Sequence, residues 1–262
     1  MNKIKIYQVD AFSNKLFQGN PAAVCPLQTW LPKKIMQSIA MENNLSETVF
    51  FIKKNEKYYI RYFTPKIEID LAGHPTLASA HIIFSEMDKE VNCVEFQTIN
   101  GEILKVNKNK NILSMDFPSS HAKKNDSSID LIFKAFKSKP KEFFVGRYAM
   151  AIFHNEDEIS NLEPDFKVIN KLKYNGLIAT APGKSCDFVS RFFAPKFGIL
   201  EDPVTGSAHC DLIPYWSRLL NKKNMIAKQL SSRSGTLYCS YRNERVTIGG
   251  EAVTFMQGYI FL

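Results

Sequence analysis

The sequence predicts an α+β fold made of two similar halves, because a pattern of strands, turn and helix occurs twice in the same order. Three pairs of segments match: RYFTPK from 61 with RFFAPK from 191, EIDLAG from 68 with EDPVTG from 201, and QTINGEILKV from 97 with QLSSRSGTLYCS from 229. The distance between partners is 130 residues for the first pair and grows slowly along the chain. Ordered matches of this kind indicate an internal repeat.

Each half is predicted to contain two strands followed by a helix. The first strands are expected at 48–52 and 177–181, where the residues are apolar or β-branched. The second strand of each half runs into the repeated Arg-aromatic-Phe motif, and a glycine-containing turn follows. The helices are expected at about 74–87 and 207–220, because apolar residues recur there at helical spacing.

A further helix is expected earlier in each half. In the first half it covers 31–43, where Pro32 suits the first turn of a helix. In the second half it covers 128–137, after a cap at Asp126 or Ser127.

The boundary between the halves is expected near residue 119. The predicted domains are 1–118 and 119–262, with the Lys-rich stretch 119–130 as a linker and with a last strand that can pack back on the first half. Duplicated halves place equivalent loops on opposite walls of one cleft. Those loops are residues 70–75 and 202–209, and they are the candidate active site.

Composition is that of a folded globular protein, with 45% hydrophobic and 23% charged residues. No apolar run reaches the roughly 18 residues of a membrane helix, and the charged N-terminal residues do not form a secretory signal. We therefore expect a cytoplasmic protein without a membrane partner. The five cysteines are odd in number and lack metal-ligand spacing, which indicates reduced thiols and no metal site.

The net charge of +8 raises the hypothesis of nucleic-acid binding. The lysines are scattered, however, and the densest stretch, 123–141, is not interleaved with aromatic residues. Solvated lysine-rich faces explain the charge better, so no nucleic-acid partner is expected.

Gly73 and Gly206 stand at the expected start of the two repeated helices. The first N–H groups of a helix and its dipole bind anions, and glycine lets a ligand approach the backbone closely. Each glycine alone is better explained as an ordinary turn residue. Their equivalence in the repeat favours two sites for a carboxylate or a delocalised carbanion.

Glu47 stands at the edge of the apolar strand predicted at 48–52, where a carboxylate is normally avoided. A carboxyl group against an apolar wall has a raised pKa, which a general acid/base at neutral pH requires. The alternative is a solvated strand end.

Three further polar residues lie in the two loops. His74 can bind a substrate or move a proton, or it is a capping or core histidine. Asp202 can accept from a substrate ammonium or fix His74, or it stabilises the helix dipole. Ser207 can donate to a bound carboxylate, or it is an ordinary N-cap. By contrast, His81, His209 and Cys210 are expected to be packing or surface residues.

With these motifs the sequence resembles the phenazine biosynthesis PhzF-like family, within the diaminopimelate epimerase fold superfamily. The segments that carry the resemblance are VDAF from 9, GNPAAV from 19, NLSET from 44, DLAGHPT from 70 and GILEDPVTGSAH from 198. The resemblance implies a cofactor-independent isomerase that forms a homodimer and whose halves each wrap a curved sheet around a central helix. It also implies Glu47 as the proton shuttle, His74 and Asp202 as assisting groups, and Gly73, Gly206 and Ser207 in the anion-binding turns.

One departure bears on the reaction. In the related epimerases two cysteine thiols from the equivalent loops act as paired acid and base, whereas Ala72 and Thr205 stand at those positions here. Neither side chain can hold an exchangeable proton of suitable pKa. A single carboxyl that removes a proton and returns it to another carbon on the same face favours an allylic isomerisation.

We therefore expect an isomerase that moves a proton in a small carboxylated, amino-acid-like substrate. Two alternatives stay open: a racemase or epimerase of an unidentified amino acid, and a non-catalytic protein that binds a small molecule.

Overall fold

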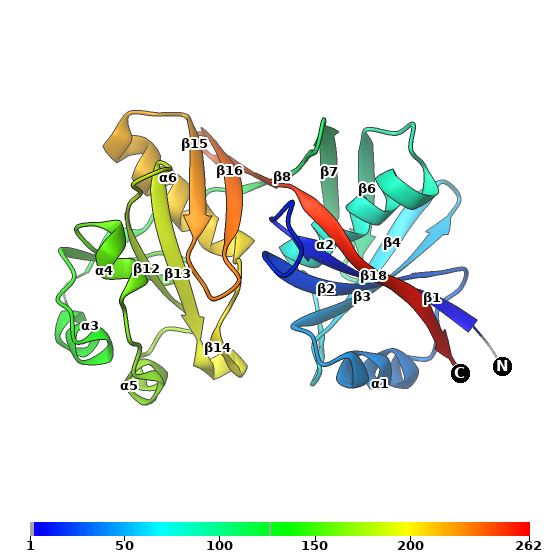
Figure 1. Cartoon of the computed structure of the whole chain (residues 1–262), viewed down its shortest axis with the longest axis horizontal. Helices are drawn as coiled ribbons and strands as arrows, with labels where there is room; N and C mark the ends of the chain where they lie inside the picture. The colour runs from blue at the N-terminus through cyan, green and yellow to red at the C-terminus, as the bar shows by residue number, and fades with distance from the viewer. Residues whose placement is uncertain (1–2, 126) are drawn as a thin grey trace. The chain divides into compact units, whose positions relative to one another are not determined.

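The computed structural model describes residues 3–125 and 127–262, which form two compact units with a mixed α and β composition (Figure 1). Unit 1 consists of Met1–Asp116 and Gly249–Leu262, and unit 2 consists of Phe117–Ile248. The predicted α+β class is confirmed. None of the helices in these residues is long and apolar enough to cross a membrane.

Unit 1 contains one continuous series of paired strands. Its elements are β1 (Lys3–Ala11), β2 (Asn20–Leu27), α1 (Lys33–Asn43), β3 (Glu47–Lys54), β4 (Lys57–Phe63), β5 (Glu68–Ile69), α2 (Gly73–Ile82), the π-helix η1 (Ile83–Met87), β6 (Cys93–Thr98), β7 (Ile103–Asn109), β8 (Ile112–Pro118) and β18 (Ala252–Phe261). The strands follow the order β18-β1-β2-β3-β4-β6-β7-β8, with parallel pairing at β2–β3 and β4–β6. The last strand, red in Figure 1, therefore pairs with β1, at the beginning of the chain.

Helices α1 and α2 lie on opposite faces of this sheet. Phe50 and Phe63 pack in one core with Met36 of α1, on one side of the strands. Helix α2 contacts β1, β2, β3, β7 and β18, so it is surrounded by sheet. Because successive side chains of a strand alternate between faces, Glu47 points away from the α1 side that Thr48 faces, and toward α2.

Unit 2 repeats this arrangement. Its elements are β9 (Lys123–Lys124), α3 (Ile129–Phe136), β10 (Glu142–Val145), β11 (Ala149–Ile152), α4 (Glu156–Ser160), α5 (Phe166–Lys171), β12 (Leu177–Pro182), β13 (Phe188–Ala194), the 3-10 helix η2 (Pro195–Phe197), β14 (Ile199–Glu201), the 3-10 helix η3 (Gly206–Ala208), α6 (His209–Leu220), β15 (Asn224–Gln229), β16 (Gly235–Arg242) and β17 (Arg245–Gly250). The order is β9-β10-β11-β12-β13-β15-β16, again parallel at two equivalent places, β11–β12 and β13–β15. The sequence repeat is thus a repeat of strand pairing.

The repeated arginines form the same ion pair in both units. Arg61 binds Glu68 through Nε at 2.6 Å and Nη2 at 3.0 Å, and Arg191 binds Glu201 at 2.7 and 2.9 Å. Two parallel hydrogen bonds fix both the distance and the orientation of each pair. They tie the second strand of each repeat to the short strand that leads into the candidate loop. The ion pair explains why the arginine motif and the acidic motif follow each other in the same order in both halves.

The structure differs from the sequence predictions in several details. Pro32 is the N-cap of α1 and not its first helical residue, and the helix predicted at 74–87 changes to a π-helix after Ile82. Helix α3 has Ser128 as its N-cap, although that side chain makes no capping hydrogen bond to the helix. Ser127 is not the cap, and Asp126 lies outside the described residues.

The lysine-rich stretch at 119–130 is not a free linker. Ser120 N–H donates to the Cys210 carbonyl at 2.9 Å, and β9 pairs with β10. These described backbone groups pair within unit 2, to which the stretch belongs.

The third sequence match is displaced by one residue from the structural equivalence. Thr98 pairs with Ile60 as Gln229 pairs with Ser190, so Thr98 is the equivalent of Gln229, and Gln97 is not. The turns after these strands differ in length, which hides the register in a comparison of residue types alone.

Candidate active site

Glu47 and His74 meet in unit 1, although 26 residues separate them in the chain. Glu47 is the first residue of β3, and His74 lies in the first turn of α2. His74 Nε2 is 3.3 Å from Glu47 Oε2, and only 12% of the Glu47 side chain is exposed. This approach lacks hydrogen-bond geometry, and within residues 3–125 and 127–262 Oε2 has no hydrogen-bond partner.

The environment of Glu47 changes its acidity. Burial removes water from the carboxylate and raises the pKa of Glu47 to about 7, while the neighbouring Ser46 hydroxyl opposes the rise. Ser46 is itself held by Asn20, whose Oδ1 accepts from the Ser46 hydroxyl at 3.3 Å. A carboxyl with this pKa exists in both protonation states near neutral pH, as a group that accepts and returns a proton must.

The start of α2 is held by buried hydroxyl groups. The Thr76 hydroxyl donates to the Ala72 carbonyl at 2.7 Å and lies 2.5 Å from the hydroxyl of Tyr62. Pro75 has no N–H, and Thr76 N–H donates back to Ala72. The amide groups at the mouth of this helix are therefore those of Gly73 and His74. A Cβ on Gly73 would meet only Met115 Cε, at 3.9 Å, so there is open space beside the Cα of Gly73.

Asp202 belongs to a cross-linked loop in unit 2. Its carboxylate accepts from the Thr205 hydroxyl at 2.5 Å, and its carbonyl accepts from Gln229 Nε2 at 2.8 Å. Gln229 is fully buried and also accepts from Thr205 N–H at 2.9 Å. One amide side chain thus satisfies both ends of the loop and fixes its shape.

Ser207 follows Gly206 in η3, which leads directly into α6. Its hydroxyl lies 3.0 Å from the hydroxyl of Tyr148, a residue that precedes β11. The structure therefore brings Glu47 and His74 together in unit 1, and Asp202 and Ser207 on one loop in unit 2.

Sequence reasoning missed Tyr148 and Gln229. The Gln229 segment was part of the third repeat match, which was a usable signal, whereas nothing in the sequence near Tyr148 connects it with Ser207, 59 residues away.

His209 and Cys210 are buried and are assigned packing roles. His209 is fully buried, its Nδ1 lies 2.9 Å from the Thr205 carbonyl, and burial lowers its pKa to about 4. Burial also raises the pKa of Cys210 to about 11, so this thiol is protonated at neutral pH. In the described part of the chain, no three His, Cys, Asp or Glu residues are grouped so as to hold a metal ion.

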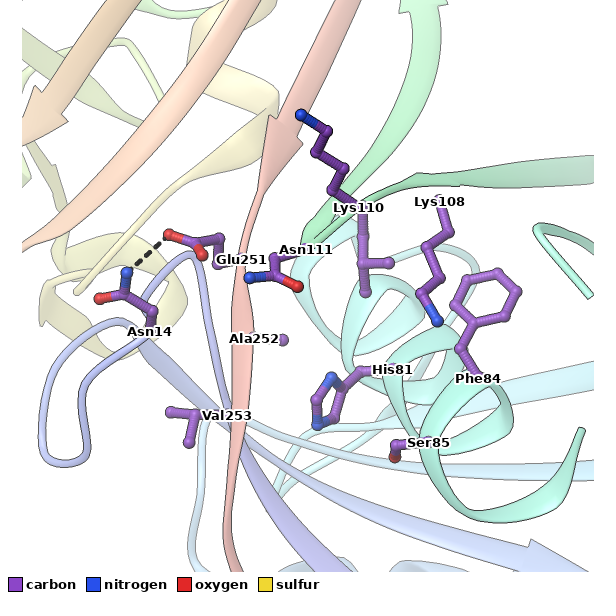
Figure 2. Close-up of a pocket in the computed structure, with 11 residues that line it drawn as sticks. Asn14, His81, Phe84, Ser85, Lys108, Lys110, Asn111, Glu251, Ala252 and Val253 are labelled. Atoms are coloured by element: carbon purple, nitrogen blue, oxygen red, sulfur yellow. Dashed lines mark hydrogen bonds between the residues drawn. The ribbon is translucent and has the colours of Figure 1, made fainter. Parts of the chain in front are cut away.

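A separate cavity of about 290 Å³ in unit 1 lies beside the other end of α2 (Figure 2). His81, Ser85 and Lys108 line it together with residues of β18, and His81 Nε2 is 3.1 Å from the Thr254 hydroxyl. The lining contains none of the predicted site residues. Its contacts explain His81 as a packing residue.

Comparison with known proteins connects this geometry with a family. The family described as "Phenazine biosynthesis-like protein" matches residues 9–258. The chain belongs to this PhzC-PhzF family.

Individual relatives in the family match over nearly the whole chain. An uncharacterized isomerase of Pseudomonas aeruginosa is 43% identical over 99% of both chains, and one of Halalkalibacterium halodurans is 41% identical over 98% of both. The crystal structure of a PhzF-family phenazine biosynthesis protein of Enterococcus faecalis matches with a TM-score of 0.97 and 42% identity, covering all of both chains. Sequence and fold place the protein among the isomerases of the PhzC-PhzF family.

Proposed function

We propose that the protein is a cofactor-independent isomerase that moves a proton within a small carboxylated, amino-acid-like substrate. Glu47 acts as the general acid/base. The observation that carries the proposal is a carboxyl group with a pKa of about 7 whose Oε2 lies 3.3 Å from the imidazole of His74, at the mouth of α2. Few structural roles require such a group, because burial of an unsatisfied carboxyl opposes folding.

His74 assists Glu47 in this proposal. A histidine ring can donate a hydrogen bond to the carboxylate form of Glu47 or accept one from the protonated form, so it follows the proton in both directions. The amides of Gly73 and His74 and the positive end of α2 stabilise negative charge that develops on the substrate.

Asp202, Gly206 and Ser207 are assigned to substrate binding, with Asp202 as the acceptor for an ammonium group and Ser207 as a donor to the carboxylate. Gln229 fixes the Asp202 loop before the substrate binds. Because the loop is already ordered, substrate binding costs less conformational entropy.

A two-thiol racemisation is disfavoured by the residues at the equivalent loop positions. Ala72 is the N-cap of α2, and the hydroxyl of Thr205 is committed to Asp202. Glu47 then supplies the exchangeable proton alone, and proton removal and return on the same face shift a double bond within the substrate.

Deuterium incorporation from heavy water tests the assignment, with a panel of amino acids and unsaturated amino or hydroxy carboxylates. Wild type is expected to exchange a carbon-bound proton of its substrate, and Glu47→Gln is expected to lower the rate by about 100-fold or more, because the amide cannot shuttle a proton. Glu95→Gln is a matched control, since Glu95 is exposed and pairs with Lys105 at 3.3 Å.

Retained exchange in Glu47→Gln would remove Glu47 from the chemistry. Ligand-induced stabilisation of wild type with no exchange across the panel would instead support the non-catalytic binding protein.

A further inference from the structure

Unit 2 has a glycine at the position equivalent to Glu47. Glu47 and Gly176 each stand one residue before the residue that pairs with the last aromatic residue of the repeated motif, Phe63 in unit 1 and Phe193 in unit 2. The repeat therefore retains the backbone of this position and loses its carboxyl group in unit 2.

The rings of Phe192 and Tyr148 together occupy the space beside Gly176. A Cβ on Gly176 would lie 2.8 Å from Cδ1 of Tyr148 and 2.5 Å from Cζ of Phe192, which is closer than carbon atoms approach. In unit 1 the residue paired with Glu47 on the neighbouring strand is the small Ala22. In unit 1 the larger residue of this pair is Glu47, on β3, and its neighbour Ala22 is small. In unit 2 the larger residue is Tyr148, just before β11, and its neighbour Gly176, just before β12, has no side chain.

Both arrangements present one polar group to the start of the repeated helix. In unit 1 the carboxyl of Glu47 faces His74, the residue after Gly73. In unit 2 the Tyr148 hydroxyl faces Ser207, the residue after Gly206, at 3.0 Å. The phenol is therefore the counterpart of the carboxyl in the second half.

The position of Tyr148 is fixed by a buried carboxylate. Asp211 accepts from the N–H groups of Arg147 at 3.1 Å and Tyr148 at 3.0 Å. The ring of Tyr148 also packs edge-to-face on Phe192, with 4.9 Å between the centroids. Gly146 is required in this turn, because a Cβ there would overlap Oδ1 of Asp211. A turn held in this way is unlike the surroundings of an ordinary surface tyrosine.

We propose that Tyr148 is a substrate-positioning residue, which together with Ser207 forms a two-hydroxyl donor for the substrate's carboxylate. Of the two O–H groups in the pair, one is used between the hydroxyls, whichever residue donates it, and the other remains to donate outward. An ionised carboxylate at this place could only accept, so the exchange of glutamate for tyrosine changes the group from one that moves a proton to one that binds an anion. The inference rests on the proposed function and names the group that binds its substrate's carboxylate.

Tyr148→Phe tests this role, with benzoate and the near-isosteric neutral benzamide as probes in NMR titrations. Loss of one hydrogen bond to an anion is expected to raise the Kd for benzoate about tenfold and to leave the Kd for benzamide unchanged. Tyr174→Phe is the matched control, because Tyr174 has the same kind of contact, with Ser128 at 3.3 Å. It is expected to bind benzoate as wild type does.

A double-mutant cycle separates a shared role from two independent ones. If Tyr148 acts through Ser207, Ser207→Ala combined with Tyr148→Phe weakens benzoate binding no more than the stronger single variant. In turnover, Tyr148→Phe is expected to raise KM with little change in kcat or in the pH dependence that Glu47 produces.

The proposal is overturned if Tyr148→Phe binds benzoate with the affinity of wild type, or if its affinities for benzoate and benzamide fall equally. It is also overturned if the losses of benzoate affinity in the two single variants multiply in the double variant, or if wild type does not bind benzoate. These results do not depend on proton transfer. Retained exchange in Glu47→Gln would remove the proposed function while leaving the benzoate result intact, and an unaffected Tyr148→Phe would remove only the present inference.

Discussion

Replacement of Glu47 by glutamine is expected to change how stability depends on pH. The pKa of Glu47 is raised from its ordinary value of 4.5 to about 7 in the folded chain, so the folded state binds more protons than the unfolded state between these two pH values. Wild type therefore loses stability as the pH rises through this window, and Glu47→Gln does not. Each pKa unit corresponds to about 1.4 kcal/mol, so Glu47→Gln should gain about 3 kcal/mol relative to wild type between pH 4.5 and pH 8.5.

Urea unfolding followed by circular dichroism at a series of pH values measures this difference. Any constant effect of the amide on packing cancels, because only the change with pH is compared. Glu68→Gln provides a control of opposite sign: although burial opposes it, the ion pairs with Arg61 and Lys33 lower the pKa of Glu68. These ion pairs stabilise wild type at pH values above the pKa that Glu68 has in the unfolded chain, and the stabilisation is lost as the pH falls. Glu68→Gln should therefore be less stable than wild type at neutral pH.

A free-energy difference between Glu47→Gln and wild type that does not vary with pH would refute the reasoning. A variant that becomes less stable than wild type as the pH rises would show that the folded chain stabilises the carboxylate, and Glu47 would then be unsuited to return a proton at neutral pH.

Two further substitutions test the repeated framework. Arg191→Met should cost about 3–5 kcal/mol in the free energy of unfolding, because it leaves the partly buried Glu201 without its two hydrogen bonds; a loss within the error of urea titration would show that the pair is not a structural tie. Gly176→Ala should cost about 1–3 kcal/mol and displace the ring of Tyr148, since a Cβ has no room beside Phe192, and unchanged stability with an unshifted Tyr148 side-chain NMR signal would contradict that placement.

Much of the fold could be predicted from sequence because the repeat multiplies weak local signals. A single Arg-aromatic-Phe motif would say little, whereas its return at Arg191 gave the correct equivalence of β4 and β13. Glu47 could be singled out because an acidic residue at the edge of an apolar strand departs from the expected pattern. The one-residue error at Gln97 shows the limit: residue types align there, but strand register depends on hydrogen bonds that the turn length controls.

The sequence by itself determined that the chain has two related halves, that each contains a helix preceded by a glycine turn, and that Glu47 is an unusual carboxyl group. Only the tertiary structure decided that Glu47 faces α2 and lies beside His74, and that Tyr148 lies beside Ser207. The physical reason is that local patterns depend on the neighbours of a residue along the chain, whereas these contacts depend on which strands pair, in which register, and on which side chain fills the space that another leaves.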